Sequence, residues 1–108
     1  MGSPLLPFLS MLVMLAYDTP EQRHQNLLRK EFEAVGGIRV QYSIYLFKGE
    51  PHECERVVRH MRRVAHGIPG DIRLLPMDET TWDAQIVISE ILEASQRLHE
   101  LQEFVKVW

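Results

Sequence analysis

The feature that most constrains the fold is the apolar run Met11–Tyr17, which ends at a single acid, Asp18. A run of this length without polar alternation is typical of a strand that is buried on both faces. Thr19, Pro20 and Gln22 follow at once, and they predict a helix that begins with a T-x-x-Q capping box. We therefore expect Asp18 in a short turn at the carboxyl end of a central strand, where sheets commonly present ligand or metal chemistry.

Spacing alone favours a simpler role for Asp18, in which it ends the strand or helps to cap the helix. The five histidines of the chain show neither H-x-x-x-H spacing nor a neighbouring acid cluster, so none is predicted to join Asp18 in a metal site. Ser43 has no histidine visibly placed to activate it, which makes a serine hydrolase a poor interpretation. Support for a chemical role of Asp18 must come from the rest of the chain.

Periodicity predicts that strands and helices alternate along the chain. The predicted elements are a strand over residues 11–17, a helix over 20–35, one kinked or two short strands over 38–48, a helix from Pro51 to about His66, a strand over 70–77 and a strand over 82–88. Cys54, Val57 and Met61 belong to an apolar stripe on the second helix, and Leu27, Leu28 and Phe32 to one on the first. This order predicts an α+β, ferredoxin-like βαββαβ sandwich with two helices on one face of a mostly antiparallel sheet.

The chain of 108 residues is long enough for one domain with a modest core, and a protein of this size often dimerises. Its net charge of −3 is uneven, because residues 1–77 carry ten Lys and Arg against eight acids, whereas residues 78–108 carry two against seven. A basic body can bind a polyanion while an acidic tail binds a protein. The single cysteine, Cys54, favours a reducing compartment, which we take as the cytoplasm.

Residues 1–10 are apolar but contain two prolines and no basic segment, so they fit a signal peptide or a membrane span poorly. We interpret them as a tag remnant or an overlong start without ordered structure, and Met11 as a natural first residue. The domain itself is predicted over residues 11–89. Residues 90–108 are predicted to form an amphipathic helical extension, in which Ile91, Leu98 and Trp108 share one apolar stripe. That stripe either packs on the protein's own dimer or docks onto a partner.

Several segments, in their order along the chain, resemble those of a known family. Ala16-Tyr17-Asp18 precedes the first helix, the stretch from Gly37 to Gly49 contains R-V-Q-Y-S, and Asp71-Ile-Arg73-Leu-Leu-Pro76 and Val87-Ile88 follow. Over residues 11–89 the chain resembles the small CRISPR-associated protein of spacer acquisition, the second of the two near-universal adaptation proteins. R-V-Q-Y-S is the most specific part of this resemblance.

The resemblance implies a homodimer in which the last strand of each chain crosses to extend the partner's sheet. It also implies that the two copies of Asp18 face each other and hold magnesium or manganese, which takes few protein carboxylates and completes its shell with water and phosphate. Members of this family are described as metal-dependent nucleases on RNA or duplex DNA. They are also described as non-catalytic bridges between integrase dimers, which hold duplex DNA for insertion. The residues of this chain fit either role.

Five arginines are candidates for binding nucleic acid. Arg56, Arg59 and Arg63 share a polar face of the second predicted helix and could contact phosphates without reading bases. Arg23 and Arg39 are further candidates, and Arg39 lies in the segment that resembles the family. The alternative for all five is an ordinary solvated surface.

Two other classes of function remain open. One is an RNA-cleaving toxin of a related ferredoxin-like family, which should cut RNA and stop growth. The other is a regulatory dimer that senses a small molecule, although the sequence contains no glycine-rich phosphate loop to support it.

Overall fold

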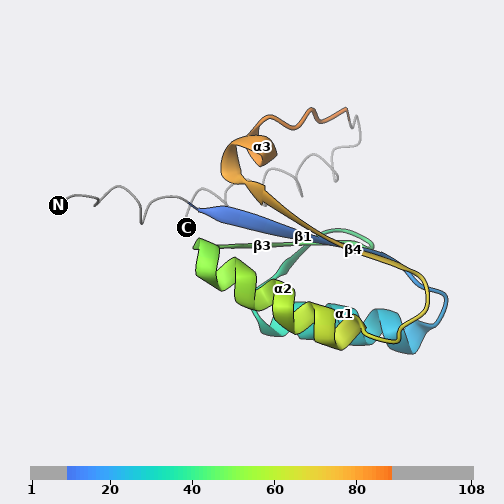
Figure 1. Cartoon of the computed structure of the whole chain (residues 1–108). Coiled ribbons are helices and arrows are strands. Elements are labelled where there is room, and N and C mark those ends of the chain that lie inside the picture. Colours follow the sequence, from blue (N-terminus) through green and yellow to red (C-terminus); the bar gives the residue numbers. More distant parts are fainter. Residues whose placement is uncertain (1–9, 89–108) are drawn as a thin grey trace.

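A computed structural model describes residues 10–88 of the chain. Its elements are β1 (Met11–Asp18), α1 (Gln22–Ala34), β2 (Ile38–Gln41), β3 (Ile44–Gly49), α2 (Pro51–Ala65), β4 (Asp71–Asp78) and α3 (Glu79–Asp83) (Figure 1). The strands form one sheet in the order β2-β3-β1-β4, and all neighbours are antiparallel. The predicted α+β sandwich with a ferredoxin-like arrangement is confirmed. No helix within residues 10–88 is both long and apolar enough to cross a membrane.

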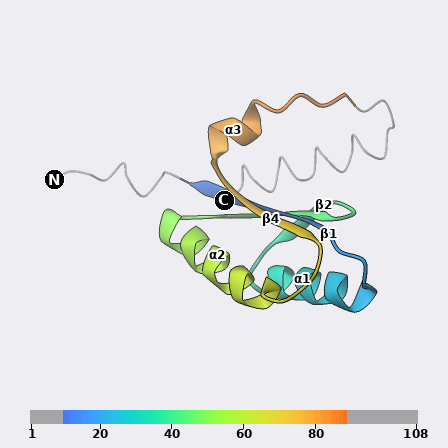
Figure 2. The same cartoon turned by 45° about the vertical axis from the view of Figure 1, so that its right-hand side comes forward.

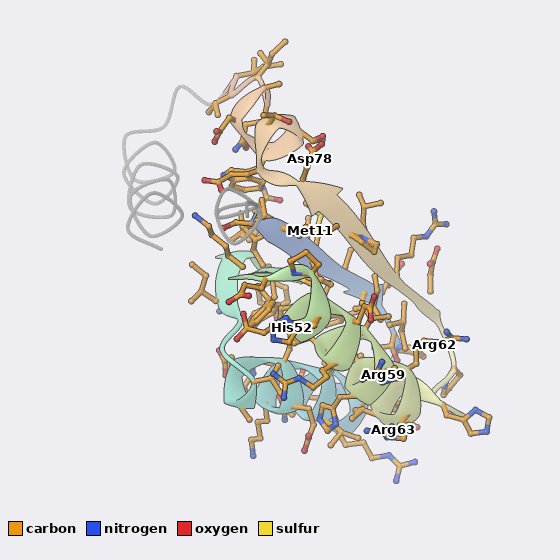
Figure 3. All side chains as sticks on the ribbon, turned by 60° about the vertical axis from the view of Figure 1, so that its left-hand side comes forward. Met11, His52, Arg59, Arg62, Arg63 and Asp78 are labelled. Carbon is orange, nitrogen blue, oxygen red and sulfur yellow. The ribbon has the colours of Figure 1, made fainter. Side chains whose placement is uncertain are left out.

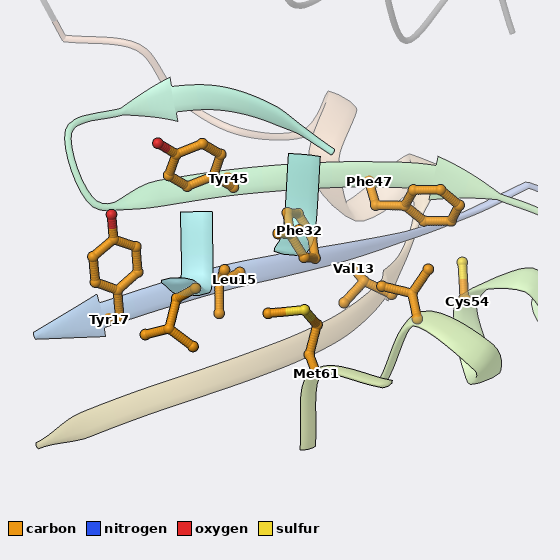
Figure 4. Close-up of a cluster of buried hydrophobic side chains, with 10 residues drawn as sticks. Val13, Leu15, Tyr17, Phe32, Tyr45, Phe47, Cys54 and Met61 are labelled. Atoms are coloured by element: carbon orange, nitrogen blue, oxygen red, sulfur yellow. The ribbon is translucent and has the colours of Figure 1, made fainter. Parts of the chain in front are cut away.

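Helices α1 and α2 lie side by side on one face of the sheet (Figures 1 and 2). Between them and the sheet lies the main core, in which side chains from β1, β3 and both helices pack together (Figure 4). Val13 and Leu15 of β1 are fully buried there, as the continuous apolar run predicts for a central strand. Cys54, Val57 and Met61 supply the buried stripe of α2, which confirms its helical periodicity. On α1, Leu28 and Phe32 of the predicted apolar stripe are buried, whereas Leu27 lies at its edge and is 41% exposed.

The opposite face of the sheet carries a smaller apolar cluster. Leu12, Val40, Leu46 and Trp82 are buried in it, and Trp82 comes from the short helix α3. Lys48 Nζ and Glu79 Oε2 lie 3.1 Å apart, and this ion pair ties α3 to β3. This face is thus covered, within the described residues, by one helix of five residues.

The first helix begins differently from the sequence prediction. It starts at Gln22 with Glu21 as N-cap, and no side chain caps it, so the predicted capping box at Thr19 does not form. The reason is tertiary packing, because Thr19 is only 2% exposed and lies against Gly70, where a Cβ would stand 3.0 Å from the Thr19 Cβ. The threonine side chain is therefore buried, and its hydroxyl makes no hydrogen bond within the described residues.

Residues 38–48, for which one kinked strand and two strands were both open, form two strands joined by a turn at Tyr42 and Ser43. The register shifts between Arg39 and Gln41, which indicates a β-bulge next to that turn.

The strand predicted over residues 82–88 is wrong in its first part. Glu79–Asp83 is a helix, because the Asp78 carboxylate accepts a hydrogen bond from the Thr81 amide at 2.9 Å and caps it. Residues 85–88 form no strand within the described part of this single chain. Pairing of this segment with a second chain stays a prediction. The predictions for residues 1–9 and for the helix over 90–108 lie outside the described residues.

Candidate metal and nucleic-acid site

Asp18 is the last residue of β1 and is exposed to solvent. Its register partner on β4 is Asp71, so the two carboxylates stand opposite each other on the same face of the sheet. A glycine is required at position 70, just before β4, because a Cβ there would lie 2.5 Å from the Asp18 carbonyl oxygen. The φ of Gly70 is also +126°, which favours glycine. The structure therefore places Asp18 where the sequence predicts it, at an open strand end.

Arg73 offsets the repulsion between these two acids. Its Nε and Nη2 donate to the two carboxylate oxygens of Asp71 at 2.8 and 3.0 Å. These hydrogen bonds lower the pKa of Asp71 and raise that of Arg73, so both groups stay charged. Sequence reasoning did not assign a site role to either residue. Their alternate spacing on one strand, opposite Asp18 in the register, is the signal that could have found them.

A cavity of about 160 Å³ lies beside Asp18. It is lined by Tyr17, Asp18, Thr19, Gln25, Tyr42 and Ser43. A second cavity, of about 80 Å³, shares Tyr17, Gln25 and Tyr42 with the first and adds Arg29 and Arg39. The structure thus brings Arg39 close to the surroundings of Asp18, as a candidate for binding nucleic acid near that acid.

The described residues contain no group of three or more His, Cys, Asp or Glu side chains that could hold a metal ion. Asp18 alone still suits magnesium, which commonly takes one or two protein carboxylates and keeps several waters. A single chain supplies few ligands within residues 10–88. A second copy of Asp18, or phosphate oxygens of a substrate, would have to complete the coordination shell.

The second helix presents a basic groove. Arg56, Arg59 and Arg63 are exposed and line a groove of about 600 Å³, whose apolar lining includes Phe47 and Val57. Figure 3 shows Arg59 and Arg63 on α2. His60 lies in the same groove, and its Nε2 is 2.7 Å from Glu31 Oε1 of α1. The predicted grouping of the three arginines is therefore present in the structure.

Two of the remaining basic side chains lie elsewhere. Arg62 lines a different groove, with Ile72 and Leu74 of β4. Arg23 is 78% exposed, lines none of the cavities described above, and pairs with Glu21 at 2.8 Å. This hydrogen bond lowers the pKa of Glu21. The structure does not bring Arg23 together with the other candidates.

Comparisons with known proteins identify the family and agree with the fold. The family model described as CRISPR associated protein Cas2 matches residues 11–85. A curated protein of Pyrobaculum aerophilum, named CRISPR-associated endoribonuclease Cas2 2, is 28% identical over 78 residues, which cover 72% of this chain and 86% of that protein. A solved structure titled crystal structure of Cas2 has the same fold, with a TM-score of 0.51, 16% identity and coverage of 74% of this chain and 88% of the other. The matched family model spans the strand that ends at Asp18, both long helices and β4, and the chain belongs to the CRISPR-associated Cas2 family.

Proposed function

We propose that this protein is a CRISPR adaptation protein that bridges integrase dimers and holds duplex DNA for spacer insertion. We further propose that it is a nuclease that hydrolyses phosphodiester bonds with a divalent metal ion, magnesium or manganese, at Asp18. The observation that carries the nuclease proposal is the exposed Asp18 at the end of a central strand, where it lines a cavity. The endoribonuclease named among its relatives supports it.

Asp18 would hold the ion together with its copy in a second chain. A bound divalent ion polarises a phosphodiester and makes a coordinated water more acidic. Asp71, opposite Asp18 in the register, is neutralised by its pairing with Arg73, so Asp18 would be the carboxylate left to hold a cation at this strand end. Arg39 lines the second cavity, which shares Tyr17 and Tyr42 with the cavity of Asp18, and it could offset negative charge that develops on the phosphate.

The basic groove of α2 would hold the nucleic-acid backbone. Arg56, Arg59 and Arg63 line one groove, so they can bind phosphates together. Binding of this kind does not read bases, and it is sensitive to salt. This suits a protein that holds duplexes of any sequence for insertion.

Cleavage by Asp18→Asn tests the nuclease proposal. Labelled duplex DNA and single-stranded RNA are incubated with wild type and variant, in magnesium or in EDTA. We expect metal-dependent cleavage by wild type and a loss of roughly 100-fold or more in the variant, because the amide no longer supplies a charged metal ligand. Metal-dependent cutting that is equal in both proteins would refute the role of Asp18. Duplex binding without any cutting by wild type would leave a scaffold only.

A triple change of Arg56, Arg59 and Arg63 to Gln tests the basic groove. We expect weaker duplex binding, with a log–log slope of affinity against salt that falls by about 1 for each phosphate the variant no longer neutralises. The matched control is Arg62→Gln, on the same helix but in a different groove. Arg62→Gln is compared with the single Gln variants at Arg56, Arg59 and Arg63. If all four weaken duplex binding equally, the groove has no special role.

The bridge to the integrase is tested by co-purification of the full chain with a CRISPR integrase from the same organism. We expect a complex that survives gel filtration and inserts duplex DNA into a repeat array. Failure to form any complex would contradict the scaffold proposal while leaving the nuclease test untouched.

A further inference from the structure

Tyr42 differs from the two other tyrosines of the chain. Tyr17 and Tyr45 are 8% and 0% exposed, and their rings stack within the main core with centroids 6.3 Å apart. Tyr42 is 71% exposed, in the turn between β2 and β3. Its ring therefore contributes little to the core, and the fold does not explain why an aromatic residue stands there.

Arg39 packs over this exposed ring. Its guanidinium carbon lies 4.9 Å from the ring centroid of Tyr42, within the range of a cation–π contact. The Arg39 Nε also donates to the Gln41 carbonyl at 3.4 Å, which orients the guanidinium. With Arg39 over the ring, an exposed fraction of 71% leaves much of the aromatic surface to solvent.

The turn that carries Tyr42 is fixed to the strand that carries Asp18. The Tyr17 amide donates to the Ser43 carbonyl at 3.2 Å, one residue before Asp18 and one after Tyr42. Tyr42 lines the cavity that contains Asp18 and also the cavity that contains Arg39. Tyr42 is thus shared by two cavities, one lined by an acid and the other by a guanidinium.

We propose that Tyr42 stacks against an unpaired nucleobase and so positions a single-stranded segment of nucleic acid beside Asp18. The proposal rests on the nucleic-acid function proposed above and adds a substrate class to that site. Exposed aromatic rings and arginine planes are the groups on which proteins stack unpaired bases, and such stacking tolerates any sequence. A base within a duplex is covered on both faces by its neighbours, so it cannot use this surface unless it leaves the stack. The site therefore selects single strands, frayed ends or loops over continuous duplex.

The test is base fluorescence without cleavage. A short single-stranded RNA containing 2-aminopurine is titrated with the full-length protein in EDTA, alongside a DNA strand of the same sequence and a blunt duplex. We expect quenching of the single-stranded probes by wild type and little quenching of the duplex. Tyr42→Ala should lose most of the quenching and bind the single strands about tenfold more weakly. Tyr42→Phe should retain most of both, because the ring and not the hydroxyl stacks on the base.

His52→Ala is the matched control. His52 is an exposed ring in the first turn of α2 (Figure 3). That helix begins two residues after Gly49, which pairs with Met11 at the end of β1 opposite Asp18. Equal quenching by wild type and Tyr42→Ala, or no quenching by wild type, would overturn the inference. So would a loss in His52→Ala as large as that in Tyr42→Ala. The comparison of RNA with DNA shows which strand supplies the base.

This experiment separates the inference from the nuclease proposal. If Asp18→Asn cleaves as well as wild type while Tyr42→Ala loses quenching, the catalytic role of Asp18 fails and the stacking surface stands. If Asp18→Asn abolishes cleavage while Tyr42→Ala binds and quenches normally, the nuclease stands and the stacking surface fails. Circular dichroism of Tyr42→Ala should match wild type, because the residue is exposed.

Discussion

The two faces of the sheet are completed in different ways. On one face, α1 and α2 cover ten buried core residues that come from both helices and the central strands. On the other face, the described cover is α3, with five residues, and its one buried side chain, Trp82, packs with three buried residues of the sheet. Met14, Ile38, Ile44 and Met77 remain only partly buried there. The first face is a finished core, whereas the second is apolar surface with little helical cover among the described residues.

We expect the two faces to have different roles: the first stabilises the single chain, and the second takes part in assembly with another chain. A helix layer that buries large side chains stabilises the chain by itself, because each fully buried aromatic or aliphatic group removes apolar area from water. A partly covered apolar face gains most from a second layer, which the homodimer predicted from the sequence would provide. That dimer stays a prediction, and substitutions on the two faces should separate the two roles.

The largest effect is expected at the centre of the finished core. Phe32 is fully buried, and its ring packs edge-on to Tyr45 with centroids 6.3 Å apart. Phe32→Ala should lower the free energy of unfolding by about 3–5 kcal/mol, because it removes this burial and leaves a cavity. Denaturant unfolding at fixed protein concentration measures the change.

Leu27→Ala, on the same helix but 41% exposed, is the control and should lower the free energy of unfolding by less than about 1 kcal/mol. A similar loss in both variants would mean that α1 does not form the face described here.

A smaller effect is expected on the second face. Trp82 is 5% exposed, but it comes from a helix of five residues and its indole Nε1 has no hydrogen-bond partner in the described structure. Trp82→Ala should lower the free energy of unfolding by about 3 kcal/mol, at the lower end for a buried aromatic residue. Circular dichroism follows the unfolding, since the change removes a fluorophore. A loss greater than that of Phe32→Ala would reverse the proposed ranking of the two faces.

Periodicity predicts most of the fold because most elements are long and have one buried side. The continuous apolar run gives β1, and the 3.6-residue stripe of Cys54, Val57 and Met61 gives α2. Helix α3 escapes this reasoning, since Trp82 and Ile86 fall into an alternation that imitates a strand. Such a short helix depends on its cap at Asp78 and on the burial of one side chain. Neither of these produces a repeating hydrophobic pattern in the sequence.

The candidate site is only partly predictable for a similar reason. Asp18 follows from its place at the end of a strand, which the local sequence shows. Asp71 and Arg73 join it through the register of β4 on β1, and Tyr42 through a turn anchored to Tyr17, so these neighbours depend on tertiary structure. The failed cap at Thr19 has the same origin, because packing against Gly70 overrides a local preference.

Residues 85–88, which follow α3, offer a test of the assembly role proposed for the second face of the sheet. Ile86 and Ile88 are 86% and 84% exposed in this single chain, and their alternate spacing suits a strand that pairs with a partner. Changing both to Asp should weaken dimerisation by at least about tenfold, since charges would enter the apolar interface. Sedimentation over a dilution series measures this, and unfolding of the monomer should be little changed. An undiminished dimer would contradict the strand exchange.

The smallest effect concerns a single hydroxyl in the finished core. Tyr45 is fully buried, and its hydroxyl has no hydrogen-bond partner among residues 10–88. Burial raises its pKa from 10.0 to about 12. Tyr45→Phe should therefore raise the free energy of unfolding by about 1 kcal/mol, because it removes an unsatisfied polar group and keeps the ring.

The same hydroxyl makes stability depend on alkaline pH. The unfolded chain ionises Tyr45 near pH 10 and the folded chain only near pH 12, so its contribution is complete below pH 10 and is lost as the pH rises through about 12. Unfolding at about pH 9 and about pH 11 should show wild type losing more stability than Tyr45→Phe. Tyr42→Phe, whose ring is exposed, should lose as much as wild type. If Tyr45→Phe loses as much as the other two, the Tyr45 hydroxyl is accessible to water and this part of the core is looser than the structure describes.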